Sequence, residues 1–62
     1  MYERLKYYRV KYKYSQQKVA EILNISQSTY SRYENGYVDN ISIKRLVQLA
    51  KIYGITVDEL IK

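Results

Sequence analysis

The 62-residue sequence contains no cysteine and no histidine. Without cysteine, it can form neither a disulfide nor a thiolate metal site. Without either residue, it also lacks the commonest general base, the thiol nucleophile and the most frequent metal ligands of enzymes. We therefore expect a protein that is not an enzyme and that uses no cofactor or metal.

Long apolar runs and a signal-peptide pattern are missing as well. A helix that spans a bilayer needs about 20 mostly apolar residues, and a secretory signal needs a charged start followed by an apolar stretch. The sequence therefore predicts a soluble, cytoplasmic protein with no membrane partner and no small-molecule ligand. Its length allows one domain, residues 1–62, with a small core that is only marginally stable.

Acidic residues are outnumbered, with 6 Asp and Glu against 11 Lys and Arg and a net charge of +5. This balance favours a polyanionic partner, because phosphate neutralisation supplies most non-specific DNA affinity. Much of the positive charge lies near the N-terminus, at Arg4, Lys6, Arg9, Lys11 and Lys13. A solvated helix face explains Lys6 and Lys13 most simply, although such charges can add long-range attraction to DNA.

Phenylalanine and tryptophan are absent, whereas tyrosine occurs nine times. Tyrosine rings can stack on unpaired bases, so binding of single-stranded nucleic acid is one possible function. Helical periodicity instead places four tyrosines in the core, with their rings buried and their hydroxyls reaching the rim. These four are Tyr8, Tyr30, Tyr33 and Tyr53.

Two short helices with a tight turn between them are predicted over Gln16–Leu23 and Gln27–Glu34. Asn24 tolerates the positive φ that a helix C-terminus often needs, and Ser26 can cap the next helix. The apolar stripe of the first helix is formed by Val19, Ala20 and Leu23. This pattern indicates a helix-turn-helix, whose second helix enters the major groove of DNA. A helical hairpin with a merely polar surface is the alternative.

Three further helices are predicted, and together they indicate an all-α fold. Their approximate ranges are Tyr2–Tyr12, Ile41–Tyr53 and Val57–Ile61. Asn40 or Ser42 would cap the second of these, and Gly54 would end it. Its apolar face is formed by Ile43, Leu46, Val47, Ala50 and Tyr53. Thr56 and Glu59 have the spacing of a capping box at the start of the last helix.

Across nearly its whole length, the chain resembles the Cro/repressor (lambda-repressor-like, XRE) helix-turn-helix family. The resemblance is carried by Ser15-Gln16-Gln17, by the run from Asn24 to Gly36, by Leu46-Val47-Gln48-Leu49-Ala50-Lys51 and by Asp58-Glu59-Leu60, in family order. It implies a compact five-helix lambda-repressor-like domain that binds a double-stranded DNA operator. Three positions depart from the family pattern, namely Lys13, Lys18 and Ile41. A left-handed backbone at Lys13 would cost on the order of 1 kcal/mol relative to glycine.

The predicted contact roles fall into two classes, because phosphate contacts set register and base contacts set sequence. Base contacts are expected from Gln27, Ser28 and Arg32, and contacts of either class from Thr29 and Ser31. By resemblance to phage repressors, phosphate contacts are expected from Gln16, Asn35, Gly36 and Tyr37.

Two further expectations concern the support of the second helix and the assembly of the protein. By the same resemblance, Arg9 should pair with Glu34, although both side chains could simply face solvent. Leu60 should turn into the core. Val57 and Ile61 share a helix face, and this face would be the contact of a homodimer. Alternatively, one or two exposed aliphatic residues need no partner.

The leading functional prediction is a sequence-specific transcriptional regulator, and a repressor rather than an activator. An antitoxin or a restriction-control regulator with the same domain is an alternative. A protein-interaction module that has lost DNA binding is another. The polar residues Gln16, Gln27, Arg32 and Asn35 argue against that loss. Binding of RNA or of single strands without sequence preference is the third alternative.

Overall fold

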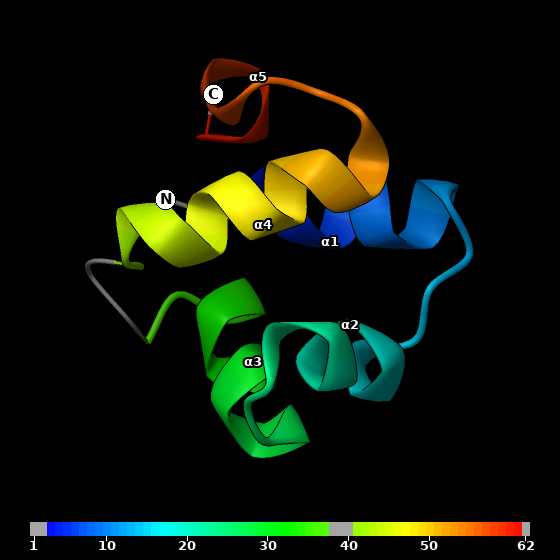
Figure 1. Cartoon of the computed structure of the whole chain (residues 1–62). Coiled ribbons are helices and arrows are strands. Elements are labelled where there is room, and N and C mark those ends of the chain that lie inside the picture. The colour runs from blue at the N-terminus through cyan, green and yellow to red at the C-terminus, as the bar shows by residue number, and fades with distance from the viewer. Residues whose placement is uncertain (1–2, 38–40, 62) are drawn as a thin grey trace.

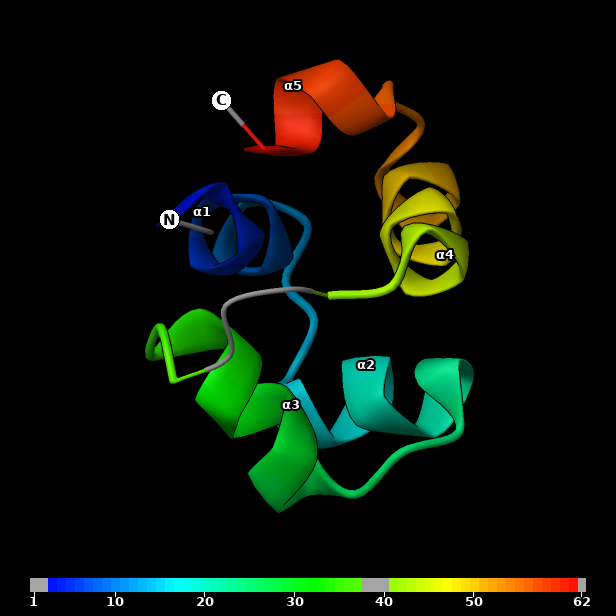
Figure 2. The ribbon, with the colours of Figure 1, turned by 90° about the vertical axis from the view of Figure 1, so that its left-hand side faces the viewer.

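The computed structural model describes residues 3–37 and 41–61, and within these ranges all regular structure is helical. The helices are α1 (Glu3–Lys11), α2 (Gln16–Leu23), α3 (Gln27–Glu34), α4 (Ile43–Tyr53) and α5 (Val57–Ile61). Helices α2 and α3 lie together at one end of the molecule, α1 and α4 lie beyond them, and α5 covers the far end (Figures 1 and 2). Helix α3 packs against α2 and α1, and α5 packs against α1 and α4. The fold is therefore the compact all-α, lambda-repressor-like arrangement that the sequence predicts.

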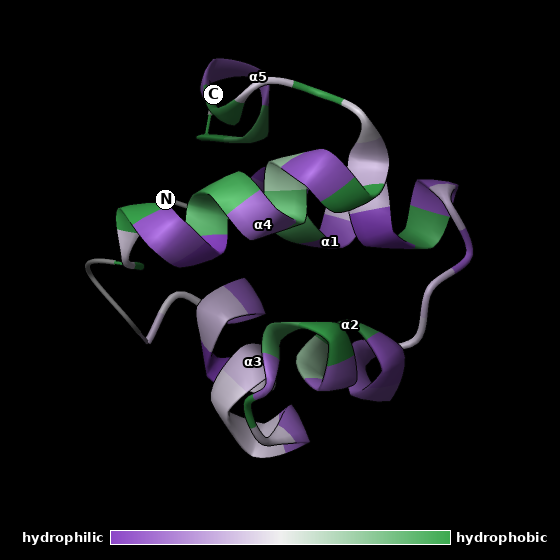
Figure 3. Ribbon diagram, in the orientation of Figure 1, coloured by the Kyte–Doolittle hydropathy of each residue, from purple (hydrophilic) through white to green (hydrophobic). Residues whose placement is uncertain are grey.

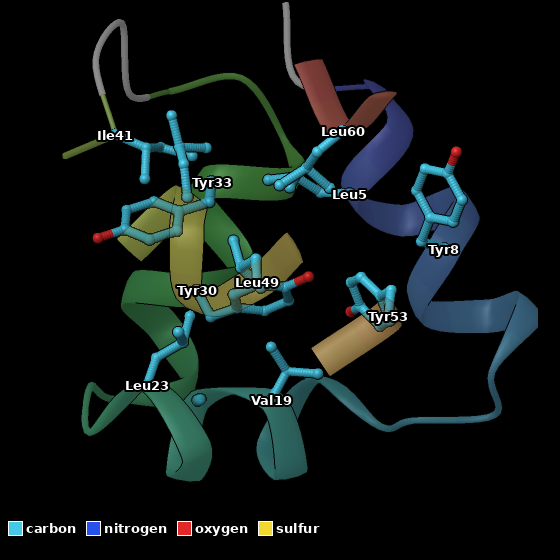
Figure 4. Close-up of a cluster of buried hydrophobic side chains, with 12 residues drawn as sticks. Leu5, Tyr8, Val19, Leu23, Tyr30, Tyr33, Ile41, Leu49, Tyr53 and Leu60 are labelled. Carbon is cyan, nitrogen blue, oxygen red and sulfur yellow. The ribbon is translucent and has the colours of Figure 1, made fainter. Parts of the chain in front are cut away.

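One buried cluster receives side chains from every helix (Figure 4). Its members are Leu5, Tyr8, Val19, Ala20, Leu23, Tyr30, Tyr33, Ile41, Leu46, Leu49, Tyr53 and Leu60. Helix α3 contributes only tyrosines, Tyr30 and Tyr33, to this core. For this reason α3 looks mostly polar in Figure 3, although one of its faces is buried. The predicted inward positions of all four core tyrosines and of Leu60 are confirmed.

Each of the first four helices ends in a Schellman motif. In every case a residue with positive φ follows the helix, and the next N–H donates to the carbonyl five residues earlier at 3.0 Å. The positive-φ residues are Lys13, Asn24, Gly36 and Gly54. Lys13, with a φ of 62°, therefore adopts the left-handed conformation that costs a non-glycine residue on the order of 1 kcal/mol.

Hydroxyl and carboxylate caps fix where the later helices begin. Ser15 Oγ accepts from the N–H of Lys18 at 3.0 Å, and Ser26 Oγ accepts from that of Thr29 at 3.1 Å. At α5, Thr56 Oγ1 accepts from the Glu59 N–H while Glu59 Oε1 accepts from the Thr56 N–H, each at 3.1 Å. The predicted capping box is thereby confirmed, and it defines the start of a helix that is only 5 residues long.

The predicted start of α4 is wrong by two residues. The helix begins at Ile43, because Ser42 has an extended ψ of 147° and caps it by accepting from the Arg45 N–H. Ile41 is buried ahead of the helix and fills the core there, whereas Ile43 is 71% exposed and does not belong to the inward face. The alternative cap, Asn40, lies outside the described residues, as does Tyr2. Helix α1 ends at Lys11, one residue before the predicted Tyr12.

Over residues 3–37 and 41–61, no helix combines the length and the apolar character that spanning a bilayer requires.

Candidate nucleic-acid interface

Helix α3 presents a polar face to solvent, opposite the tyrosines that anchor it. Gln27, Ser28 and Arg32 are exposed, and Thr29 and Ser31 are half-buried. Because Tyr30 and Tyr33 are fixed in the core, the helix cannot rotate about its axis without exposing them. The predicted base-contact residues therefore lie together on one accessible face.

The polar side chains on this face differ in whether they form hydrogen bonds within the chain. Thr29 Oγ1 lies 2.8 Å from Ser26 Oγ, Ser28 Oγ lies 3.3 Å from the same atom, and Ser31 Oγ accepts from Asn35 Nδ2 at 3.3 Å. Within the described part of the chain, no internal hydrogen bond or ion pair engages the side chains of Gln27 or Arg32. These two long side chains are therefore the ones available for a partner.

The residues after α3 form an exposed turn of fixed shape. Asn35, Gly36 and Tyr37 are all exposed, and the Tyr37 N–H donates to the Arg32 carbonyl at 3.0 Å. Gly36 has a φ of 78°, and a Cβ atom placed on it would meet nothing within 4 Å. Glycine is therefore needed for the left-handed backbone rather than for space.

A partly buried ion pair joins the end of α3 to α1. Arg9 Nε donates to Glu34 Oε2 at 2.6 Å and Arg9 Nη2 donates to Glu34 Oε1 at 3.3 Å. The same guanidinium donates through Nη1 to the Tyr14 carbonyl at 2.9 Å. Only 13% of the Arg9 side chain and 2% of the Glu34 side chain are exposed. Both charges thus lie in the interior and face each other rather than solvent.

Gln16 at the start of α2 belongs to the same cluster. Its Nε2 donates to Glu34 Oε1 at 3.1 Å, so one carboxylate receives donors from two other helices. This contact, which the sequence does not indicate, points the amide nitrogen of Gln16 toward Glu34. The backbone N–H groups of Gln16 and Gln17 precede the first intrahelical bond, so the helix start can still offer donors to an anion.

The charge states of the pair follow from these contacts. Burial alone would raise the pKa of Glu34, but the donors of Arg9 and Gln16, the nearby Tyr30 hydroxyl and the charge of Arg9 outweigh it and hold this pKa below its ordinary value. The hydrogen bond to Glu34 raises the pKa of Arg9 in turn. The carboxylate is therefore ionised over the whole neutral range.

Two tyrosines depart from the expected arrangement. The hydroxyls of Tyr30 and Tyr53 do not reach the rim, because both oxygens are buried and lack a hydrogen-bond partner. The Tyr53 ring packs against the rings of Tyr8, Tyr12 and Tyr14, beside α1, and the Tyr30 ring points inward from α3 (Figure 4). One signal for this was present in the sequence: Tyr30 lies four residues before Glu34, which places both on the same helix face.

The expected dimer residues differ from each other in exposure. Ile61 is 41% exposed, whereas Val57 is half-buried and packs against the core of its own chain. Lys6 on α1 and Lys13 just after it, which were expected to face solvent, are exposed. Lys11 Nζ lies 5.8 Å from the ring centroids of both Tyr7 and Tyr12.

The geometry defines a class of protein: a helix-turn-helix domain with a capped, outward-facing polar second helix. The helix-turn-helix family model matches residues 5–60. The chain belongs to the Cro/repressor-like (XRE-type) helix-turn-helix family.

Two relatives from Bacillus subtilis (strain 168) are similar to the chain. The SPbeta prophage-derived uncharacterized HTH-type transcriptional regulator YonR is 40% identical over 60 residues, which cover 97% of this chain and 55% of YonR. The HTH-type transcriptional regulator AnsR is 41% identical over 59 residues, which cover 95% of this chain and 50% of AnsR. The chain thus spans about half the length of these curated relatives. No solved structure matches it at a significant level.

The ion pair yields a pH-dependent prediction. Arg9→Met leaves the buried carboxylate of Glu34 without its main partner and should cost about 3 kcal/mol of unfolding free energy at pH 7. The lowered pKa of Glu34 contributes stability above its unfolded-state pKa, and this contribution is lost as the pH falls through the folded-state pKa. The deficit of Arg9→Met should therefore shrink below about pH 4.

Urea unfolding of both proteins between pH 7 and pH 3 measures this effect. Arg4→Met is the matched control, because Arg4 is exposed on the same helix, and its change should stay within about 0.5 kcal/mol. A deficit for Arg9→Met that does not change with pH would contradict the assigned role of the pair.

Proposed function

We propose that this chain is a sequence-specific transcriptional repressor that binds a double-stranded DNA operator as a homodimer, with α3 in the major groove. The coarser statement, that it is a DNA-binding transcription regulator, is supported by the family and by the names of its relatives. The finer statement rests on one observation: α3 is locked by its caps and tyrosines while Gln27 and Arg32 remain exposed and unengaged.

Sequence would be read by the two long side chains on that face. Arg32 can donate two parallel hydrogen bonds to the O6 and N7 atoms of guanine, and Gln27 can form a bidentate contact with adenine. Ser28, Thr29 and Ser31 are shorter, and their hydroxyls already have neighbours. They would contribute single contacts to bases or to phosphates.

Phosphate contacts at the start of α2 and just after α3 would set the register of the protein on the DNA. The N–H groups at the start of α2 and the helix dipole favour a phosphate there, beside Gln16. The Asn35 amide, the Gly36 backbone and the Tyr37 hydroxyl would contact phosphates after α3. Repression follows from occupancy in the simplest case, because a protein bound to an operator excludes others from the same DNA.

The proposed homodimer would place two α3 helices on one face of DNA, about 34 Å or one turn apart. Ile61, with Val57 beside it, would supply the contact from α5. Because Val57 packs partly against the core of its own chain, only a small apolar surface is left for this contact. We therefore expect weak association in free solution and a stable pair on DNA.

The base-reading role of Arg32 leads to a testable difference between two duplexes. Arg32→Ala should weaken binding to the cognate duplex by about 1–3 kcal/mol and relax preference at one base pair. Gln16→Ala should weaken cognate and scrambled duplexes more evenly. Titration of each variant against both duplexes measures this, and Arg4→Ala controls for the loss of one positive charge. Equal losses on both duplexes for Arg32→Ala would remove it from the base-reading role.

The dimer contact predicts a loss of cooperativity. Val57→Ala combined with Ile61→Asp should abolish cooperative binding to a two-half-site operator while leaving binding to one half-site unchanged. Val10→Asp, which adds the same charge at an exposed aliphatic residue of α1, is the control. Sedimentation with and without operator DNA provides the readout. If the variant with both α5 substitutions still binds as a cooperative pair, α5 is not the interface.

A further inference from the structure

Two buried tyrosine hydroxyls near the ion pair take part in none of the hydrogen bonds described above. Tyr30 is 0% exposed and Tyr53 is 4% exposed, and each hydroxyl oxygen lacks a hydrogen-bond partner. Leaving a buried hydroxyl unpaired is costly, and such groups are uncommon in folded proteins. Phenylalanine would fill the same space without that cost, so these two hydroxyls call for an explanation.

The two side chains converge on one region of the interior. Figure 4 shows the hydroxyl of Tyr30, from α3, and that of Tyr53, from α4, pointing toward each other. In contrast, the hydroxyls of Tyr8 and Tyr33 point away from this region. The carboxylate of Glu34 lies one helical turn beyond Tyr30 on the same face of α3.

Glu34 still has room for a donor. A carboxylate has about four lone-pair sites. Oε1 accepts from Arg9 Nη2 and Gln16 Nε2, and Oε2 accepts only from Arg9 Nε. One site on Oε2 is therefore open, and the Tyr30 hydroxyl lies near enough to this carboxylate for each to shift the other's pKa.

We propose that Tyr30 and Tyr53 are positioning residues that form a hydrogen-bond relay from α4 to the end of α3. The Tyr53 hydroxyl donates to the Tyr30 oxygen, and the Tyr30 hydroxyl donates to the open site on Glu34 Oε2. Small side-chain movements or one ordered water close the links. The relay joins α4 to the network that already connects α1, α2 and α3.

The protonation states leave both hydroxyls able to donate at neutral pH. Burial, followed by the nearby Glu34 carboxylate, raises the pKa of Tyr30 far above its ordinary value. Burial also raises the pKa of Tyr53 to about 12. Both hydroxyls therefore keep their protons at neutral pH, and the ionised carboxylate is the natural end of the chain of donors.

The functional consequence rests on the proposed function. Glu34 immediately precedes the exposed turn Asn35–Tyr37, for which phosphate contacts are proposed. A relay that fixes Glu34 from the α4 side would set the rotation of α3 and the position of this turn. Its loss should weaken operator binding even though neither tyrosine touches DNA.

The test combines two variants with two matched controls. Tyr30→Phe and Tyr53→Phe each remove one hydroxyl of the relay. Tyr33→Phe and Tyr8→Phe remove hydroxyls from equally buried rings that point elsewhere. Carboxyl NMR titration of Glu34 should show its pKa rising by about half a unit or more in Tyr30→Phe, because a donor to the charged form is lost. The rise should be smaller in Tyr53→Phe and absent in both controls.

Two further readouts complete the experiment. In the wild-type protein, the hydroxyl protons of Tyr30 and Tyr53 should exchange slowly enough to be observed by NMR. Operator affinity should fall about fivefold in Tyr30→Phe, the loss expected for one hydrogen bond, and stay within about twofold in the controls.

The outcomes separate the relay from the proposed function. An unchanged pKa of Glu34 in both relay variants overturns the relay, whatever happens to DNA binding. A raised pKa with unchanged operator affinity overturns the positioning role. If the wild-type protein binds no duplex, the proposed function fails, while the pKa and the hydroxyl protons still decide whether the relay exists.

Discussion

The Arg9–Glu34 ion pair lies where α1, α2 and α3 meet, and the rest of the interface depends on it. One guanidinium binds both the carboxylate at the end of α3 and the carbonyl that follows α1. Burying two charges carries a large desolvation cost, which only good geometry and additional donors offset. Gln16 supplies one such donor, and through it the start of α2 is tied to the end of α3. The end of α3 is therefore held by side chains of α1 and α2 as well as by its own terminating turn.

This arrangement explains how a helix of 8 residues can present a polar surface in a fixed orientation. An isolated helix of this length is not stable in water. Here Ser26 fixes its start, Gly36 fixes its end, and Tyr30 and Tyr33 are the residues that it buries in the core. Because these residues cap and anchor the helix, Gln27 and Arg32 remain available for a partner. Buried and exposed residues are separated by the helical period, in which residues three and four apart share a face.

Much of this could be predicted from the sequence because local chemistry determines it. Serine caps and positive-φ residues placed α2, α3 and the end of α4 correctly and the end of α1 to within one residue, and the Thr56–Glu59 box placed α5. The start of α4 was missed because Ile41 and Ile43 both fit an apolar pattern, and only the packing decides which one is buried. Long-range contacts were harder still. The amide of Gln16 and the hydroxyls of Tyr30 and Tyr53 depend on how three helices converge, and the sequence carries only one sign of it, the four-residue spacing of Tyr30 and Glu34. The ion pair was predicted only by family resemblance, and the dimer contact remains a prediction.

If α3 reads the major groove of a two-fold operator, as proposed, selection from random duplexes should enrich a symmetric sequence with half-sites about one DNA turn apart. In methylation interference on the selected duplex, methylation of guanine N7, which lies in the major groove, should then block binding within each half-site. No enrichment over the starting pool, or interference only from adenine N3 in the minor groove, would exclude this mode of binding.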